Sequence, residues 1–504
     1  MIALSIEIKG VDRDRLKPFE VEGVEELSTL YRFDVSCSAR AEDKVLGAEV
    51  VGRWANLTIA VDRQAPRVVK GVIESGAVMA SVTRDEIIYR FRLSPAISRL
   101  RTSRHNHIFG TFSPVSVADV LRLELSGELR RSSEAGDSDH PEFPNDLRLR
   151  ADYPVWDHLT QYEETDFDFL SRLCEHTGIF YFFEDGPTAE TIVFADYNLF
   201  TPNLDSPSVV PYSPDPGAPD VAGVLRTFEA VYAATSRQVL LQDYNDQFPH
   251  LPLLASQVVD PHGRGNWVEY GDHYRSLAEG DALAGVRAEE LACSRIQFRG
   301  ASTVARLAPG RMFEMADHSL AGWNRKYLVV SVRHRIKAAL DGTVDPTGAA
   351  RGAYGNEFVV IPSDVPFRPS RRTPRPRVDG VLNGRVEGNG SNEDPFIDAL
   401  GRYRVRLPFD LSGAPAGFGS QWMRKIEPYG GAGNGMHFPL PPGTHVLVAF
   451  VNGDPDRPVI VGALPAADNP SVVVAGTHQH NRIATRSGIV FTMTDPLSKA
   501  AGEP

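Results

Sequence analysis

Residues 450–462 read FVNGDPDRPVIVG, and the two aspartates and the arginine in this stretch allow two interpretations. Asp454 and Asp456 could be a carboxylate pair for acid–base hydrolysis, which requires one raised pKa and a concave site. Alternatively, Gly453 and Asp454 turn the chain, and the aspartates accept backbone hydrogen bonds. A proline precedes Asp456, another follows Arg457, and VIVG then resumes a strand. This pattern favours a turn between two strands.

The turn lies among short strand-like segments that Gly and Pro separate. These segments are RYRVRLPFD (402–410), SQWMRKIEPY (420–429), GMHFPLPPGTHVLVAFV (435–451) and RPVIVGAL (457–464). Short strands at roughly regular spacing are typical of a compact barrel. Before them, residues 361–380 contain five prolines and five arginines. Because proline fixes φ and removes backbone donors, we interpret this stretch as an extended linker at a domain boundary. Residues 481–495 predict one or two further strands.

The first hundred residues alternate with a period of two. From Tyr31 to Cys37 every second side chain is apolar, and the polar residues from Arg32 to Ser36 lie between them. This pattern predicts antiparallel strands with one solvated face. Further along the chain the sequence predicts short helices and polar or Pro-rich loops. The expected helices are 116–125 and 276–294, and the expected loops are 129–148 and 201–219.

Residues 153–185 predict a local unit of helix, helix and strand. Trp156, Leu159 and Tyr162 recur at helical spacing. Thr165 can cap a second helix, because its side chain accepts a backbone hydrogen bond and acids follow in the first turn. That helix has an apolar stripe and a glycine where a left-handed C-terminal residue belongs. These residues are Leu170, Leu173, Cys174 and Gly178.

Composition restricts the class of protein. A chain of 504 residues should form two to four domains, and 37 Pro, 43 Gly and 25 Phe favour β-structure. The net charge of -12 argues against a general nucleic-acid binder. Cys37, Cys174 and Cys293 are isolated, which fits a reducing compartment and excludes a disulfide framework or a thiolate zinc site. The N-terminal residues show no signal peptide, and no apolar run approaches the ~20 residues of a membrane helix.

Several other motifs suggest chemistry but are better explained as structure. YEETDFDF (162–169) crowds four acids, yet it lacks the calcium-loop pattern, and helix N-termini attract acids. His478 and His480 would share a face if they lay on one strand, which in a three-fold assembly could place six imidazoles around an axis. We expect packed or surface histidines there. HNH (105–107) lacks a nuclease's acidic context, and GGAGNG (430–435) is not placed in a βαβ unit. We therefore expect no catalytic, cofactor-binding or metal-binding residues.

Together these segments resemble VgrG proteins, the trimeric spike proteins of type VI secretion systems, which are related to phage baseplate hub and tail-spike proteins. The resemblance is carried by motifs in the family's order over nearly the whole chain. They are QYEETDFDFLSRLCEHTGIFYFFE (161–184), GDHYRS (271–276) with the helix after it, PFRPSRRTPRPRVDGVLNGRVEG (366–388), DALGRYRVRLPFD (398–410), GNGMHFPLPPGTHVLVAFVNGDPDRPVIVGAL (433–464) and HNRIATRSG (480–488).

The resemblance implies a mainly β fold with a few helices. Residues 1–370 correspond to phage-hub-like β-barrel domains, with a helical insert at about 153–178. Residues 371–466 correspond to the linker and a five-stranded oligonucleotide/oligosaccharide-binding (OB) barrel. Residues 467–504 correspond to the start of a triple-stranded β-helix needle. The family's needle usually continues beyond the residues present up to Pro504, so the needle is either short or truncated, and binding of a tip protein stays open.

The implied function is structural and not enzymatic. A homotrimer would adapt a hexameric tail tube to a three-fold puncturing tip, contact baseplate proteins and carry effectors, with a tip protein as a further partner. It would bind no nucleic acid, meet the target membrane only by puncture, and reside in the cytoplasm until a contractile machine exports it or a particle releases it. Alternatives are the spike of an extracellular injection particle or phage tail, a hydrolase using acids such as Glu163 or Asp166, and an OB-type nucleic-acid or sugar binder. The last would use a basic, aromatic strand with Arg402, Tyr403, Arg404 and Arg406.

Overall fold

A computed structural model of the chain divides into two compact units. Unit 1 comprises residues 1–104, 116–154 and 165–375, and unit 2 comprises residues 105–115, 155–164 and 376–504. Two short segments, residues 105–115 and 155–164, therefore belong to unit 2 although the chain returns to unit 1 after each of them. From residue 376 onward the whole chain belongs to unit 2. The structure describes residues 2–40, 45, 47–61, 63–83, 86–127, 143–186, 189–205, 208–215, 223–338, 352–389 and 394–495.

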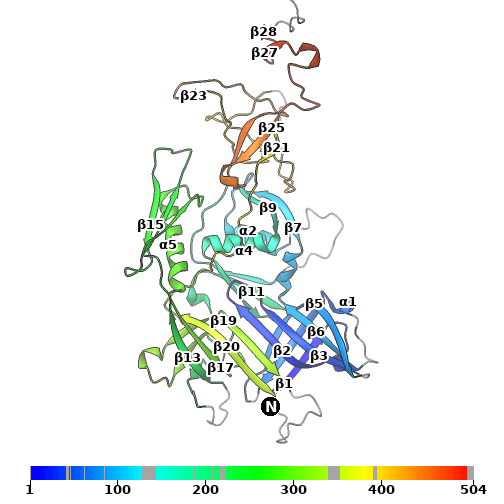
Figure 1. Ribbon diagram of the computed structural model, residues 1–504, viewed down its shortest axis with the longest axis vertical. Coiled ribbons are helices and arrows are strands. Elements are labelled where there is room, and N and C mark those ends of the chain that lie inside the picture. Colours follow the sequence, from blue (N-terminus) through cyan, green and yellow to red (C-terminus); the bar gives the residue numbers. More distant parts are fainter. Residues whose placement is uncertain are drawn as a thin grey trace, which may run out of the picture. The chain divides into compact units, whose positions relative to one another are not determined.

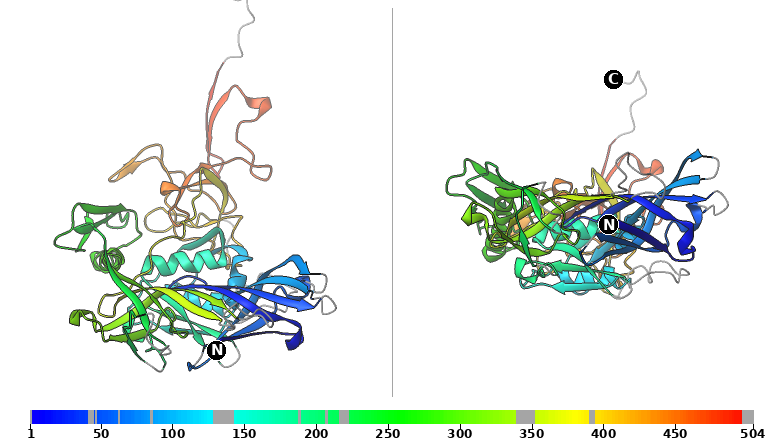
Figure 2. Two further views of the ribbon diagram at one scale, coloured as in Figure 1. Left: turned by 60° about the horizontal axis from the view of Figure 1, so that its bottom comes forward. Right: turned by 90° about the horizontal axis from the view of Figure 1, so that it is seen from below.

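Unit 1 is built on a twelve-stranded sheet with the main order β1-β4-β5-β6-β3-β2-β19-β20-β17-β13. Two halves of this sheet meet where β2 pairs with β19 (Figures 1 and 2). Strands β12 and β18 complete the sheet beside β19. The strands are β1 (Ile2–Ile8), β2 (Lys17–Glu26), β3 (Arg32–Arg40), β4 (Trp54–Val61), β5 (Arg67–Thr83), β6 (Glu86–Ser94), β12 (Val209–Pro211), β13 (Leu225–Tyr232), β17 (Ile296–Ser302), β18 (Met312–Ala316), β19 (Lys326–Lys337) and β20 (Ala353–Pro362).

The alternation read from the first hundred residues is confirmed for its apolar side chains, but Ser36, which was expected on the solvated face, is buried as well. Phe33, Val35 and Cys37 are fully buried in the core of the first half, while Arg32 is exposed. Strands β1 to β6 pair in antiparallel fashion. A second apolar cluster, which contains Phe298 and Phe358, fills the other half. Each half of the sheet thus has a core of its own.

Smaller elements of unit 1 flank this sheet. One three-stranded sheet has the order β10-β11-β8, and another has the order β15-β14-β16 and packs on helix α5. The remaining elements are α1 (Gly47–Val50), α2 (Val117–Leu125), β8 (Asn145–Arg148), α4 (Asp166–Thr177), β10 (Phe180–Asp185), β11 (Glu190–Ala195), β14 (Gln238–Asp243), β15 (Leu253–Val258), β16 (Asn266–Tyr270) and α5 (Leu277–Cys293). Among the described residues, no helix has the length and apolar character needed to cross a membrane.

The expected helices α2, α4 and α5 are confirmed. Thr165 caps α4 by accepting a hydrogen bond from the Asp168 backbone N–H at 3.1 Å. Gly178 ends this helix with a φ of 77°, where a Cβ would lie 2.6 Å from Val286 Cγ1. Glycine is therefore required at this position for two reasons: the backbone is left-handed, and α5 packs too closely to leave room for a Cβ.

The first helix expected within 153–185 is wrong, because Leu159–Thr165 forms strand β9 and pairs with β7 (Arg104–Phe109). Its backbone N–H groups donate to acceptors that are distant in sequence, and not to carbonyls within the same segment. The N–H of Thr160 donates to Asp456, and that of Glu163 donates to Asn106. Hydrogen bonds to distant segments thus outweigh the helical pattern that Trp156, Leu159 and Tyr162 form in the sequence. The expected loop at 129–148 lies mostly outside the described residues, and its last four residues form β8.

Unit 2 contains a four-stranded sheet with the order β22-β21-β25-β26. These strands are β21 (Val381–Val386), β22 (Val405–Arg406), β25 (His445–Phe450) and β26 (Pro458–Ala463). A fifth segment joins them through bridges from Met423 to Tyr403 and from Lys425 to Ile460. One apolar cluster fills this barrel. Two hairpins accompany it, β23 (Gly430–Gly431) with β24 (Asn434–Gly435), and β27 (His480–Ala484) with β28 (Val490–Thr494).

Candidate functional sites

The Asp454–Arg457 stretch is a turn between β25 and β26. Asn452 and Gly453 have positive φ values of 58° and 73°, which reverse the chain. Asp454 Oδ1 accepts a hydrogen bond from the Asp456 N–H at 3.0 Å. The Arg457 N–H in turn donates to the Asp454 carbonyl at 2.9 Å. Asp454 therefore stabilises the turn through its backbone contacts. This weakens the hypothesis that the two aspartates are a carboxylate pair for hydrolysis.

The same turn anchors three other parts of unit 2. Asp456 Oδ1 accepts a hydrogen bond of 2.6 Å from the backbone N–H of Thr160, a fully buried residue on β9. The Gly453 carbonyl accepts one of 2.8 Å from the Val378 N–H at the end of the linker. Gln421 Nε2 donates to the Asp456 carbonyl at 3.2 Å. The turn thus joins three segments that are distant from it in sequence or lie outside its own hairpin.

Replacing Asp456 by alanine is expected to lower the free energy of unfolding of unit 2 by about 1–3 kcal/mol, because the buried Thr160 N–H loses its acceptor. Chemical denaturation followed by tryptophan fluorescence measures this loss. Asp456→Asn keeps an acceptor oxygen and should restore most of the stability. The interpretation fails if Asp456→Ala costs no more than Asp468→Ala, which removes an exposed carboxylate.

The other candidate motifs are structural as well. Asp166 is fully buried at the start of α4 and accepts a 2.5 Å hydrogen bond from Ser103 Oγ, while Phe169 is a core residue. HNH lies on β7, where Asn106 accepts hydrogen bonds from the N–H groups of Glu163 and Leu411. GGAGNG forms the β23–β24 hairpin. Among the described residues, no group of three His, Cys, Asp or Glu side chains could hold a metal ion.

The two histidines of HQH do not share a strand. A 3-10 turn spans Ala475–Thr477, and His478, which follows it, has helical backbone angles. Only His480 belongs to β27. His478 Nδ1 lies 2.9 Å from the Ala475 carbonyl oxygen, and His480 Nδ1 lies 2.9 Å from Arg482 Nη2. The same-face pair assumed for an axial metal is therefore wrong within one chain, because the turn ends the alternation before the strand begins.

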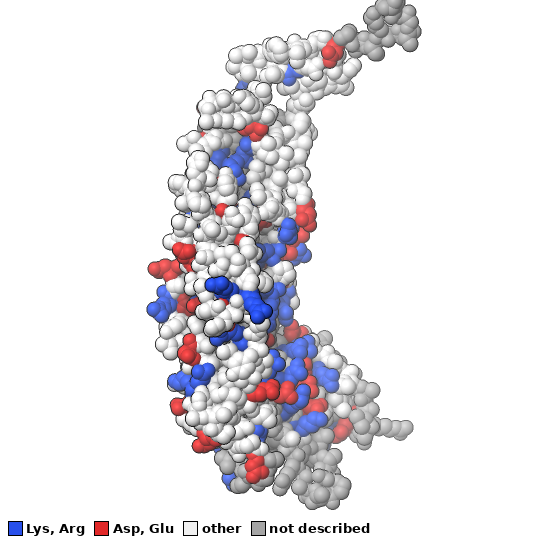
Figure 3. Space-filling model, turned by 60° about the vertical axis from the view of Figure 1, so that its left-hand side comes forward, with Lys and Arg blue, Asp and Glu red and all other residues white. Residues whose placement is uncertain are grey.

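The basic, aromatic strand expected of an OB-type binder is divided between two faces. Tyr403 is fully buried in the barrel core, whereas the side chains of Arg402 and Arg406 are partly exposed and form ion pairs with Asp398 and Glu387. Side chains alternate along a strand, so the tyrosine cannot join the arginines in one platform. On the face drawn in Figure 3, Lys and Arg groups are also interleaved with Asp and Glu. Both observations weaken the nucleic-acid hypothesis.

Sequence reasoning missed an aromatic cluster around Arg404. The Arg404 guanidinium carbon lies 4.6 Å from the ring centroid of Phe418 and 5.0 Å from that of Trp422. Phe112 contacts Phe418, and Phe396 contacts Trp422, with centroid distances of 5.0 Å and 4.9 Å. Burial lowers the pKa of Arg404. Phe418 and Trp422 are four residues apart, but Phe112 is distant in sequence, so no local spacing connects the whole cluster.

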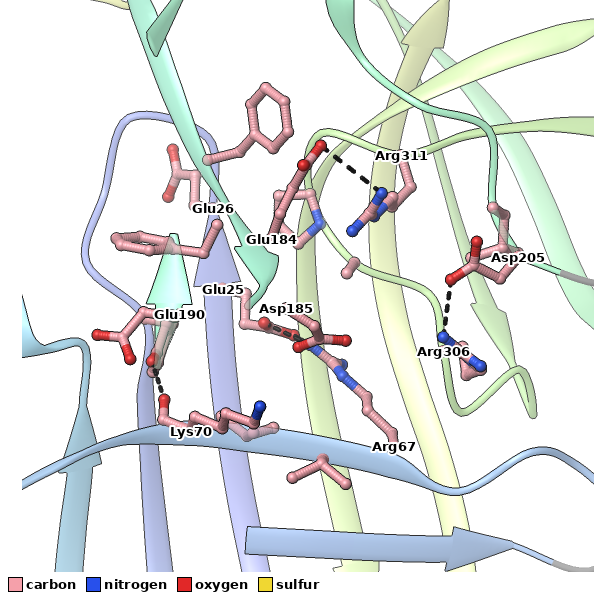
Figure 4. Close-up of a pocket in the computed structure, with 18 of the residues that line it drawn as sticks. Glu25, Glu26, Arg67, Lys70, Glu184, Asp185, Glu190, Asp205, Arg306 and Arg311 are labelled. Carbon is pink, nitrogen blue, oxygen red and sulfur yellow. Dashed lines mark hydrogen bonds and ion pairs between the residues drawn. The ribbon is translucent and has the colours of Figure 1, made fainter. Parts of the chain in front are cut away.

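Unit 1 contains a polar cavity of about 70 Å³ between β2, β5, β10 and the loop before β18 (Figure 4). Acids and bases in its wall pair with each other. Arg67 donates two hydrogen bonds to Glu25, at 2.6 and 2.7 Å, and Arg306 pairs with Asp205 at 2.7 Å. The cavity wall is therefore a junction of ion pairs that ties separate strands together.

Glu25 also belongs to a buried network. Its Oε2 lies 2.8 Å from His334 Nε2, and His334 Nδ1 lies 2.9 Å from the Tyr354 hydroxyl. Burial raises the pKa of Glu25, but Arg67 and His334 outweigh it and hold the value at about 2. Burial lowers the pKa of His334. The tyrosine–histidine–carboxylate series resembles a proton relay, but His334 is completely buried, so a substrate cannot reach its ring.

Glu190 lies in the same cavity wall and has the opposite shift. Burial raises its pKa to about 7, although the Ala96 N–H donates to its carboxylate. The folded protein therefore binds an extra proton between pH 4.5 and 7, and stability from this group falls as the pH rises through that range. Glu190→Gln should be more stable than the wild type at pH 8, by up to about 3 kcal/mol, and much closer to it at pH 4.5. Urea denaturation at both pH values tests this, and an equal difference at both would contradict it.

The arginine-rich linker is extended, as expected, and is held by acids of unit 1. Arg371 forms a two-pronged ion pair with Glu269 on β16 and a second pair with Glu290 on α5. Arg375 pairs with Asp272 at 2.8 Å. Glu175 on α4 accepts hydrogen bonds from the backbone of the linker. The prolines keep the backbone of the linker extended, and the ion pairs of the arginines hold it against unit 1.

Comparison with known proteins agrees with this architecture. Residues 24–340 match the family described as phage tail baseplate hub (GPD). The chain belongs to this family. Residues 390–464 of this hub protein match the type VI secretion system/phage-baseplate injector OB domain. The mainly β, hub-like fold followed by an OB barrel is thus confirmed.

Relatives of the hub protein are named as spike proteins. It is 28% identical over 478 residues to the type VI secretion system spike protein VgrG5 of Pseudomonas aeruginosa, covering 92% of this chain and 58% of the relative. It is 25% identical over 502 residues to the actin cross-linking toxin VgrG1 of Vibrio cholerae, covering 95% of this chain and 44% of the relative. The chain thus spans about half the length of the curated relatives it matches.

Solved structures share its fold. One is the E. coli c3393 protein, described as a type VI secretion component with structural similarity to the T4 tail proteins gp27 and gp5. Its TM-score is 0.64 at 23% identity, covering 91% of this chain and 99% of that chain. Another is the Francisella PdpA-VgrG complex, with a TM-score of 0.60 at 9% identity, covering 98% of this chain and 75% of that chain.

Proposed function

We propose that this hub protein is the structural, homotrimeric hub and spike of a contractile injection machine of the type VI secretion kind. Unit 1 would form the collar that receives a hexameric tail tube, and the barrel would connect it to a three-fold tip. The protein would carry effectors and contact baseplate proteins, without chemistry of its own. The machine would export it from the cytoplasm, and it would meet the target membrane only by puncture. The named relatives and the order of the two family matches support this proposal.

The observation that carries the trimer is the hairpin β27–β28. Every residue of β28 is exposed, and Ile483, Phe491 and Met493 lie on one face of the hairpin with no core to cover them. An isolated two-stranded hairpin is marginal in water. Two further copies of the same hairpin would bury these side chains around an axis, as a triple-stranded needle requires.

The native mass in solution, measured by light scattering, tests the proposal. A particle of three chains that persists at micromolar concentration supports it. A uniform population of single chains overturns it. Effector carriage is tested separately by coexpression, with a cargo protein recovered on the trimer as the supporting result.

A further inference from the structure

An arm whose central residues carry no charge projects from the barrel of unit 2. Every residue from Pro428 to Pro439 is exposed, and the β23–β24 hairpin lies in the middle of this stretch (Figure 1). Between Glu427 and His437 the arm has no charged residue. Its large side chains are apolar and about half exposed. They are Ile426, Tyr429, Met436 and Phe438. We call residues 426–438 the arm.

The arm has little to hold it in shape by itself. Its ladder contains two residue pairs, Gly430 with Gly435 and Gly431 with Asn434. Glycine loses more conformational freedom on ordering than any other residue, and so short a hairpin is not stable alone. Grouped apolar side chains at an exposed site mark a contact surface. A glycine-rich backbone also lets another surface approach closely.

A matching surface lies on the outer wall of the barrel. We call the Phe112, Phe418, Arg404 and Trp422 cluster the wall. Phe112, at one end of it, is 66% exposed. The Nε–H of Arg404 is buried and has no hydrogen-bond partner among the described residues. Aromatic rings at the barrel surface suit an apolar, glycine-rich segment, because the rings can cover its apolar side chains.

The occupant of the wall should be the arm of a neighbouring copy. Only residues 464–479 separate the last barrel strand from the β27–β28 hairpin, so three joined hairpins would keep three barrels close to one axis. In a ring with three-fold symmetry, each copy uses two different surfaces, and one surface of each copy contacts the other surface of the next copy. The arm and the wall are such a pair.

We propose that the arm of each copy packs on the wall of the next copy, so that three arm–wall contacts close the ring of barrels. This inference rests on the homotrimer proposed above and assigns one of its interfaces. It makes the barrel part of the trimer contact in addition to the needle.

Cysteine cross-linking tests the contact. The doubly substituted chain Asn434→Cys, Ser113→Cys places one thiol at the tip of the arm and one beside Phe112. The three native cysteines are buried, so a short bis-maleimide should react mainly with the new thiols. Covalent three-chain products on a denaturing gel are expected, at a yield several-fold above that of either single variant. Asn434→Cys with Val381→Cys is the matched control, because Val381 is exposed at the start of β21, pairs with Ala449 and is not part of the wall.

The outcomes separate this inference from the trimer itself. If the protein is a trimer and the double variant forms no more covalent trimer than the control, the arm does not contact the wall and the inference is wrong. If light scattering finds single chains, the trimer fails first and the interface fails with it. Covalent trimer from the double variant, with little from the control, supports the contact.

Discussion

Replacing Ile483 and Phe491 together with aspartate is expected to convert three-chain particles into single chains. These residues face each other across β27 and β28 and are 49% and 57% exposed in one chain. Full burial of such a side chain contributes about 1.5–3 kcal/mol, and about half of each remains to be buried, which amounts to about 4–9 kcal/mol over two residues in three copies. Aspartates in their place would also have to lose their hydration. We therefore expect the double variant to dissociate at micromolar concentration.

Light scattering across a dilution series measures this change. Thr492→Asp is the matched control, because Thr492 pairs with Arg482 on the other face of the hairpin. Circular dichroism should show that units 1 and 2 stay folded in both variants. A double variant that keeps the mass of three chains would show that the needle face does not hold the trimer. Dissociation of the control alone would assign the contact to the opposite face.

Removing the positive charge from the Glu25 network is expected to cause the largest loss of stability within one chain. Arg67→Met leaves the Glu25 carboxylate buried beside His334 without its main partner. Breaking a buried ion pair in this way costs about 3–5 kcal/mol. In the wild type the pKa of Glu25 is about 2 and its ordinary value is 4.5, so its contribution is complete above pH 4.5 and is lost as the pH falls towards 2.

The pH dependence separates this effect from a simple packing defect. In Arg67→Met the burial of Glu25 is no longer offset, so its pKa should lie above 4.5 and the carboxyl can be neutralised by protonation. The difference in unfolding free energy from the wild type should then be smaller at pH 4.5 than at pH 7. Arg335→Met, which breaks an exposed pair with Glu357, should cost less than about 1 kcal/mol. A loss of that small size for Arg67→Met would refute the role of the network.

Local patterns predicted the elements whose causes are local. The capped helix that begins after Thr165 and ends at Gly178 was predictable, because a cap, an apolar stripe and a left-handed glycine act within a few residues of each other. The Asp454 turn was predictable for the same reason, since the prolines fix φ and Gly453 permits the positive φ of the turn. The strand at Leu159–Thr165 was not predictable, because its hydrogen bonds go to residues as distant as Asp456.

The candidate sites show the same division. A sequence reader could list Glu25, Arg67 and His334 but could not know that strands β2, β5 and β19 bring them together in the core. The Arg404 cluster was equally hidden, because Phe112 lies almost three hundred residues before it. Conversely, HQH looked like a same-face pair until a 3-10 turn was found at its first histidine.

By itself, the sequence determined the family, the order of hub and barrel, and the role of FVNGDPDRPVIVG as a turn. It could do so because the fixed φ of proline, the positive φ that glycine permits and the periodicity of apolar residues are all properties of neighbouring positions. Only the tertiary structure decided that Asp456 holds β9, that Tyr403 is buried while Arg404 is sandwiched between aromatic rings, and that the arm and the hairpin lack cover in one chain. Those facts depend on which distant segments meet, and burial and hydrogen bonding between distant segments have no signature in local spacing.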